Sequence, residues 1–169
     1  MADRNRGGAG RIALFPASFD PITNGHLDLI RRSRAIFDET VLAIARNVSK
    51  NATFSVEERL ELLESVTGDM EDVSVQVFDG LVVHHAEQIG ASAIIRGLRA
   101  MSDFEYEFEM ALMNKHLAPG VEIVFFMTSQ EYLYVSSSRL KELVRFGASI
   151  DEFVPAIVSA ALKQKLRGA

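Results

Sequence analysis

The chain of 169 residues contains no cysteine and no tryptophan. The lack of cysteine excludes disulfide bonds, and it excludes zinc and iron–sulfur sites that are held by thiolates. A chain without thiols also suits a reducing compartment. We therefore expect a cytoplasmic protein.

Long hydrophobic segments are also missing. The longest apolar run, residues 121–127, is interrupted by Glu122 and is much shorter than the roughly 20 residues that cross a bilayer. Residues 1–10 are polar and glycine-rich and lack the apolar centre of a signal peptide. We expect a soluble protein with no membrane partner, in which residues 1–10 form a disordered tail and residues 11–169 form one domain.

The chain has no excess of basic residues. It carries 18 Lys and Arg against 23 Asp and Glu, a formal net charge of −5. Because nucleic-acid-binding proteins present a basic surface, we expect no nucleic-acid partner. A small anionic substrate is still compatible with this charge, since a few cations can converge on it locally.

Short β-prone runs alternate with helical patterns along the chain, which is typical of βαβ units around a parallel sheet. The predicted fold is an α/β, Rossmann-like three-layer sandwich with a five-stranded parallel sheet. Right-handed crossovers would place the carboxyl ends of the strands along one edge. We expect strands at 12–15, 40–45, 73–78, 93–96 and 121–127, and helices that begin near Gly25 and Ser55 or cover 81–89, 102–117, 137–146 and 155–166.

Local sequence signals predict several helix ends. Ser55 with Glu58 and Ser102 with Glu105 have the spacing of capping boxes. Residues 104–110 alternate as an edge strand would, but the second capping box and the unbroken continuation favour a helix. Gly90 is expected to end the third helix in the left-handed conformation.

The first predicted strand ends in Pro-Ala-Ser-Phe-Asp-Pro-Ile-Thr-Asn-Gly-His, residues 16–26, directly before a helix. A helix N-terminus presents unpaired N–H groups and a partial positive charge, so it attracts anions. His26 adds a ring N–H there, Ser18 adds a hydroxyl, and Gly25 permits close approach to the backbone. The pattern indicates a site for a nucleotide phosphate; the alternative is an ordinary turn in which His26 only caps the helix.

Polar residues also follow the later strands. Lys50 lies in the loop after the second strand, and Arg96-Gly97-Leu98-Arg99 follows the fourth. An arginine at the end of a buried strand is costly without an anion, although Glu105 or Glu107 could supply one internally. Three serines, residues 136–138, begin the fifth helix and could cradle a triphosphate, whereas a single serine would be only a cap.

Two common nucleotide-binding motifs are absent from the sequence. It has neither a Walker A motif nor a Gly-x-Gly-x-x-Gly after the first strand. His84, His85 and His116 lack the spacing and the carboxylate neighbours of a metal site, so we interpret them as structural and expect no metal held by protein ligands.

The Ser-Phe-Asp-Pro and Thr-Asn-Gly-His segments resemble the signature of the nucleotidyltransferase superfamily. Together with the Ser49-Lys50 loop, Arg-Gly-Leu-Arg, Phe-Glu-Tyr-Glu at 104–107 and Val-Ser-Ser-Ser at 135–138, they resemble the bacterial phosphopantetheine adenylyltransferase family over roughly residues 11–165. The resemblance implies transfer of the adenylyl group of ATP to 4′-phosphopantetheine, giving dephospho-coenzyme A and pyrophosphate. It also implies Mg²⁺ as the cofactor and a homohexamer.

The same resemblance implies roles for individual residues. His26, as transition-state stabiliser, Lys50 and Arg99 would be catalytic, and Ser18, Lys50, Val82 and Arg96 would bind phosphopantetheine. The implied ATP contacts are Ser18, Phe19, His26, Gly97, Leu98, Arg99, Glu107, Tyr132, Leu133, Tyr134, Val135, Ser136, Ser137 and Ser138.

Two positions depart from the family pattern. Ala17 stands where glycine is usual and tolerates a positive φ less well. His84-His85 stands where a polar residue followed by an aromatic is common, which affects the expected pantetheine pocket. Alternative functions are another small nucleotidyltransferase, acting on nicotinamide mononucleotide or with CTP, and a non-catalytic nucleotide-binding regulator.

Overall fold

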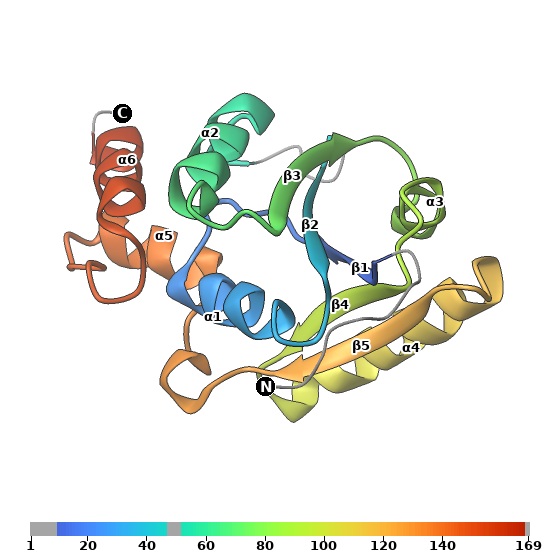
Figure 1. Cartoon of the computed structure of the whole chain (residues 1–169). Coiled ribbons are helices and arrows are strands. Elements are labelled where there is room, and N and C mark those ends of the chain that lie inside the picture. The colour runs from blue at the N-terminus through green and yellow to red at the C-terminus, as the bar shows by residue number, and fades with distance from the viewer. Residues whose placement is uncertain (1–9, 47–51, 168–169) are drawn as a thin grey trace, which may run out of the picture.

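Five parallel strands in the order β3-β2-β1-β4-β5 form the centre of the protein (Figure 1). The structure is a computed structural model that describes residues 10–46 and 52–167. Of the predicted tail it describes only Gly10, and the loop with Lys50 lies outside the described residues. The strands are β1 Ile12–Pro16, β2 Glu39–Ala45, β3 Val73–Phe78, β4 Ala93–Leu98 and β5 Glu122–Met127.

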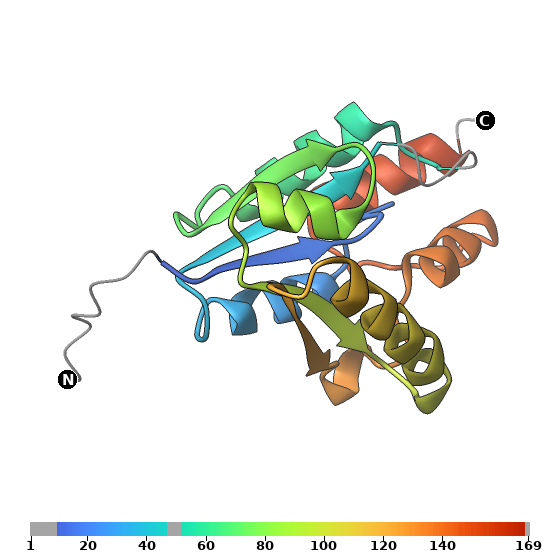
Figure 2. The same ribbon diagram turned by 90° about the vertical axis from the view of Figure 1, so that its right-hand side faces the viewer.

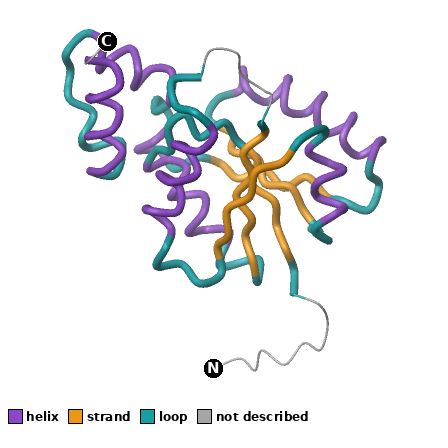
Figure 3. The backbone as a smooth tube through the Cα atoms, turned by 90° about the horizontal axis from the view of Figure 1, so that it is seen from above, coloured by secondary structure: helices purple, strands orange, loops and turns teal. Residues whose placement is uncertain are grey.

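Helices cover both faces of this sheet, as predicted for a three-layer α/β fold. Helices α1, α2, α5 and α6 lie on one side in Figure 1, and α3 and α4 lie on the other. Figure 3 shows the strands at the centre with the helices around them. No helix in the described part of the chain is both long and apolar enough to cross a membrane. The helices are α1 Asn24–Ser33, α2 Val56–Thr67, α3 Val82–Gln88, α4 Met101–Leu117, α5 Ser137–Arg145 and α6 Ala156–Arg167, with a short 3₁₀ turn at Gln130–Tyr132.

The pleat of the strands sends alternate side chains to the two faces. In β1, Ala13 and Phe15 belong to the core under α1, α2, α5 and α6, whereas Leu14 belongs to the core under α3. In β2, Leu42 follows the first pattern and Val41 the second. Strands buried on both faces explain the nearly continuous apolar runs that identified them in the sequence.

The helix ends show where local signals were sufficient. The capping box of Ser55 and Glu58 is confirmed, and Gly90 has the expected left-handed φ of 68°. The capping box predicted at Ser102 is wrong, because α4 begins at Met101 and its N-cap residue is Ala100, without a side-chain cap. A capping box that we did not predict, formed by Thr23 and His26, starts α1.

Because all strands are parallel, their carboxyl ends meet at one edge of the sheet, as the arrowheads in Figure 2 show. The chain leaves β1 toward β2 on one side and reaches β4 on the other. Such a reversal of strand order opens a crevice beyond the strand ends, which is where ligands bind in open α/β sheets. The sequence motifs therefore converge beside β1.

Candidate active site

A cavity of about 600 Å³ lies beyond the ends of β1 and β4. The walls come from the β1–α1 loop, the first turn of α1 and the first turn of α5. Most residues selected from the sequence meet here, although they are far apart in the chain. The predicted residues that line the cavity are Ser18, His26, Val82, Arg96, Gly97, Arg99, Tyr132, Val135, Ser136, Ser137 and Ser138.

The β1–α1 loop requires one left-handed residue, and that residue is Phe19, with a φ of 46°. Ala17 does not have a positive φ, so its departure from glycine causes no strain there. The buried Phe19 ring meets the His26 ring edge-on, with 5.2 Å between centroids. A strained backbone of this kind persists only where the surroundings fix it.

The surroundings that fix this loop converge on the buried carboxylate of Asp20. It accepts hydrogen bonds from the backbone N–H groups of Thr53 (3.0 Å) and Phe54 (2.8 Å), which precede α2. Lys141 Nζ of α5 lies 2.6 Å from Asp20 Oδ2. Burial alone would raise the pKa of Asp20, but these hydrogen bonds hold it below its usual value, so the carboxylate is charged at neutral pH. Asp20 thus joins three separate segments: its own loop, the segment before α2, and α5.

His26 is held in one tautomer by the start of its own helix. Its Nδ1 lies 3.1 Å from the backbone nitrogen of Thr23 and accepts that N–H. Burial, and secondly the charge of Arg99, lower the pKa of His26 to about 4. The ring is therefore neutral at pH 7 and carries its proton on Nε2. His26 therefore supplies a neutral N–H donor to the cavity.

The neutral state of His26 predicts a loss of stability in acid. An unfolded histidine has a pKa near 6.5, whereas folded His26 titrates at about 4, so between these values protons favour the unfolded chain. We expect the free energy of unfolding to fall as the pH is lowered from about 6.5 to 4. Urea denaturation at several pH values within this range measures it.

His26→Gln is the control, because glutamine at this helix position also accepts the capping N–H but does not titrate. Its stability should depend less on pH than that of the wild type. Burial also lowers the pKa of His85, so part of the dependence remains in the variant. Identical pH dependence in the two proteins would contradict the assignment to His26.

Arg96 lies at the end of β4 and forms a two-pronged ion pair with Glu107 of α4. Its Nε and Nη2 lie 2.7 and 2.6 Å from the two carboxylate oxygens. Its Nη1 donates to the carbonyl oxygen of Pro16 at 3.3 Å, which directs the guanidinium across the end of β1. The internal salt bridge considered from the sequence is thus present, and Glu107 rather than Glu105 forms it. The binding of a substrate phosphate by Arg96 stays a prediction.

Gly97 and Arg99 line the cavity beside Arg96. Arg99 pairs with Asp103 in the first turn of α4, with 3.1 Å between Nε and Oδ2. A Cβ atom at Gly97 would lie 2.6 Å from Leu29 Cδ1, so a larger residue here would require the Leu29 side chain of α1 to shift.

The three serines at the start of α5 have different surroundings. Ser136 is the N-cap, and its Oγ accepts the backbone N–H of Arg139. The Ser137 hydroxyl donates to the carbonyl oxygen of Pro21 at 2.7 Å. No hydrogen bond of the Ser138 side chain to a described residue is found, which makes it the serine best placed to serve a ligand.

Several predicted site residues lie outside the cavity wall. Phe19 and Leu98 are buried, Glu107 binds Arg96, and Leu133 and Tyr134 are exposed. Lys50 lies outside the described residues. His84 and His85 do not line the cavity, and His85 stacks on Phe78 with 4.8 Å between ring centroids.

The cavity also contains residues that sequence reasoning missed, chiefly Thr23, Leu29, Thr128 and Arg59. Arg59 left a detectable signal, because it lies three and four positions before Leu62 and Leu63, the buried residues of α2. A charged residue on the buried stripe of a helix is unusual and indicates a specific partner.

The family profile described as "Cytidylyltransferase-like" matches residues 14–143 of this chain. A protein of Caldanaerobacter subterraneus subsp. tengcongensis, named phosphopantetheine adenylyltransferase, is 52% identical over 157 residues, which cover 93% of this chain and 98% of that protein. A protein of Desulfitobacterium hafniense with the same name is 49% identical over 155 residues, covering 92% and 95%.

Solved structures show the same fold at lower sequence identity. The nicotinic acid mononucleotide adenylyltransferase of Plasmodium falciparum has a TM-score of 0.65 and 10% identity, covering 94% of this chain and 95% of that one. At this identity the likeness concerns the arrangement of helices and strands alone.

Proposed function

This chain belongs to the phosphopantetheine adenylyltransferase family, and we propose that the cavity beside β1 is where it brings ATP and 4′-phosphopantetheine together. The enzyme transfers the adenylyl group of ATP to 4′-phosphopantetheine in the synthesis of coenzyme A. A phosphate oxygen of phosphopantetheine forms a bond to the α-phosphorus, and the bond from that phosphorus to the bridging oxygen breaks. Dephospho-coenzyme A and pyrophosphate are the products.

The nature of the cavity wall supports catalysis by positioning. The attacking phosphate is already an anion at neutral pH, so no strong general base is required. The described residues that line the cavity include no carboxylate, whereas they include His26, two hydroxyl-bearing helix starts and three arginines. Such donors stabilise negative charge on the oxygens around the α-phosphorus and hold the reacting groups in line.

The single observation that carries this proposal is the neutral His26 fixed by Thr23 at the start of α1. With Nδ1 occupied by the capping N–H, the ring offers one donor, Nε2–H, in the first turn of α1, where the N–H groups of Asn24 and His26 already donate to Phe153 and Thr23. A neutral donor does not form a lasting ion pair with ATP, so it can act on the charge that shifts during attack. This geometry favours transition-state stabilisation over storage of a nucleotide.

The lining residues suit Mg²⁺ that enters with ATP. Mg²⁺ binds oxygen ligands and usually keeps several waters while it contacts substrate phosphates. No group of three or more His, Cys, Asp or Glu that could hold a metal is found among the described residues. The ion would then be bound by the phosphates, with the hydroxyl of Ser138 as an available protein ligand, and would neutralise the pyrophosphate that leaves. The absence of cysteine supports our proposal of a cytoplasmic location.

The reverse reaction tests the function directly. The protein is incubated with dephospho-coenzyme A, pyrophosphate and Mg²⁺, and formation of ATP is measured. We expect ATP only when all three are present. Parallel incubations with nicotinamide adenine dinucleotide or a CDP-alcohol should give no nucleoside triphosphate. The assignment would be contradicted if ATP or CTP formed from nicotinamide adenine dinucleotide or a CDP-alcohol but not from dephospho-coenzyme A. It would also be contradicted if none of the three compounds gave a nucleoside triphosphate.

The free hydroxyl of Ser138 predicts a selective effect on ATP. We expect Ser138→Ala to weaken the binding of ATP by about tenfold or more and that of phosphopantetheine much less, because one hydrogen bond to a charged group contributes about 1.5–3 kcal/mol. Calorimetric Kd values for both substrates check this. Ser136→Ala is the control, since it removes the cap and not the free hydroxyl. Equal, small losses for both ligands would leave Ser138 without a role in ATP binding.

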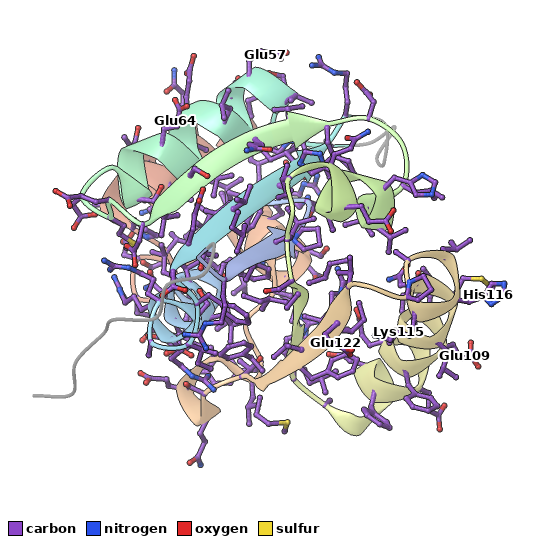
Figure 4. All side chains as sticks on the ribbon, turned by 45° about the vertical axis from the view of Figure 1, so that its right-hand side comes forward. Glu57, Glu64, Glu109, Lys115, His116 and Glu122 are labelled. Atoms are coloured by element: carbon purple, nitrogen blue, oxygen red, sulfur yellow. The ribbon has the colours of Figure 1, made fainter. Side chains whose placement is uncertain are left out.

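Helix α4 supports the homohexamer that we propose. None of its side chains that the structure describes is buried, and large apolar residues are exposed along it, among them Tyr106 at 64% and Leu112 at 58%. Figure 4 shows Glu109 and His116 on the outer side of the same helix, whereas Lys115 lies toward Glu122 of β5, so charged and apolar groups are mixed on α4. A patch of this kind marks an interaction surface, and further copies of the chain are the partners that we propose.

The assembly is tested by native mass spectrometry of the full chain. We expect a mass of six copies, and we expect Leu112→Glu to shift it toward smaller species, because a charge would be buried in the contact. Glu109→Gln is the control. A monomer at all concentrations, for the wild type, would contradict the proposal.

A further inference from the structure

The charges around the cavity are mostly compensated within the protein. Arg96 pairs with Glu107 and Arg99 pairs with Asp103, and both carboxylates come from α4. His26 is neutral at pH 7. These groups therefore add little net positive charge to a cavity that has to hold several phosphates.

Arg59 is different. It is the only cationic residue among those described that is buried, with 6% of its surface exposed, and it lines the cavity. Its Nη1 donates to the carbonyl oxygen of Ser18 at 2.8 Å, and its Nε donates to that of Ser55 at 3.2 Å. No carboxylate of a described residue lies within 4.0 Å of its guanidinium.

The nearby acidic residues do not replace such a partner. Glu57, two positions before Arg59 in the chain, is exposed and lies on the outer side of α2 in Figure 4. Glu58 pairs with Lys165 of α6, and Asp20 pairs with Lys141. Residues 47–51, which lie outside the described part, contain no Asp or Glu.

A buried guanidinium without an anion is unfavourable, because two carbonyl dipoles do not compensate a full charge removed from water. Proteins keep such a group where a ligand supplies the missing charge, since arginine binds phosphate with two parallel hydrogen bonds. Arg59 lines the cavity from α2, whereas Arg96 lines it from β4, so a phosphate bound in the cavity can meet cations from two separate elements.

We propose that Arg59 is a further phosphate-binding residue of this site, and that a substrate phosphate compensates its charge. The proposal rests on the proposed function only in that both substrates carry phosphates. The competing role is structural, in which Arg59 only holds the carbonyl oxygens of Ser18 and Ser55.

Arg59→Met and Arg59→Lys separate these roles. Calorimetry gives the Kd of each protein for inorganic pyrophosphate, ATP and phosphopantetheine at 50 and 200 mM salt. We expect Arg59→Met to weaken the binding of at least one of these ligands by about tenfold or more. The Kd for that ligand should also depend less on the salt concentration. Arg59→Lys, which keeps the charge, should retain the salt dependence with a smaller loss of affinity. Lys165→Met is the matched control, because it removes one positive charge from α6 outside this cavity, and it should bind as the wild type does.

The ligand that is weakened identifies the phosphate. Weaker binding of both pyrophosphate and ATP assigns Arg59 to the triphosphate of ATP. Weaker binding of phosphopantetheine alone assigns Arg59 to the phosphate that attacks. If Arg59→Met binds all three ligands with wild-type affinity, the proposal is overturned. A lower affinity whose dependence on salt is unchanged would also overturn it, because that result would show that a displaced Ser18 loop is the cause. If Arg59→Met does not fold, the same comparison is made with Arg59→Lys and Arg59→Gln. A wild type that binds these ligands but gives no ATP in the reverse assay contradicts the proposed function and not the role of Arg59.

Discussion

His26→Ala is expected to lower kcat by at least about 10²-fold, with a smaller change in the Kd values of both substrates. Removing one donor from an oxyanion site costs about 10²–10³-fold in kcat, and His26 offers its Nε2–H where charge shifts during attack. Its neutral state, with a pKa of about 4, makes it a better donor to a transition state than a partner for the ground-state anion. Steady-state kinetics with binding measured separately test this.

Alanine also removes the capping box with Thr23, so part of the loss could come from a frayed helix start. His26→Gln separates the effects, since glutamine keeps an acceptor for the Thr23 N–H but presents no ring donor. We expect thermal stability close to that of the wild type and turnover as low as in His26→Ala. Turnover near the wild-type value in either variant would remove His26 from the mechanism.

Arg96→Lys is expected to weaken the binding of phosphopantetheine by about tenfold or more and to lower kcat. Lysine keeps the charge but loses the planar fork, so it can no longer bind both oxygens of Glu107 and also direct donors into the cavity. A misplaced nucleophile is a costly defect, since the reaction depends on alignment of the phosphate with the α-phosphorus.

The internal ion pair makes the interpretation of Arg96→Lys depend on stability. Thermal unfolding and phosphopantetheine binding therefore need to be measured side by side for this variant. Arg99→Lys is a useful comparison, because its ion pair with Asp103 is more exposed. A less stable Arg96→Lys protein that binds phosphopantetheine as well as the wild type would show that Arg96 serves only the fold.

The sequence was informative about which segments meet and less so about which atoms do. Parallel strands must end at one edge, so the placement of Ser18, Arg96 and the three serines around one cavity followed from the alternation of strands and helices. The choice between Glu105 and Glu107 did not follow. Successive residues of an α-helix are rotated by about 100° about the helix axis, so Glu105 and Glu107 point in very different directions. Only the packing of α4 against the sheet decides which of the two faces Arg96.

Two further features depended on tertiary structure. The left-handed residue of the β1–α1 loop is Phe19, a bulky residue for which no local preference predicts a positive φ. Arg59 was missed because a charged side chain is not expected on the buried face of a helix. The buried face of α2 nevertheless includes Arg59, Leu62 and Leu63.

The junction at Asp20 has a consequence for synthesis on the ribosome. The last strand ends at Met127, whereas Lys141, which compensates the buried Asp20 carboxylate, is made 14 residues later. At roughly 5–20 residues per second, translation leaves an interval of about one to three seconds in which all five strands exist without that lysine. During this interval the Asp20 carboxylate, in the loop between β1 and α1, lacks its lysine partner. The junction that holds the loop between β1 and α1 is therefore completed only after α5 has docked, near the end of the synthesis of the chain.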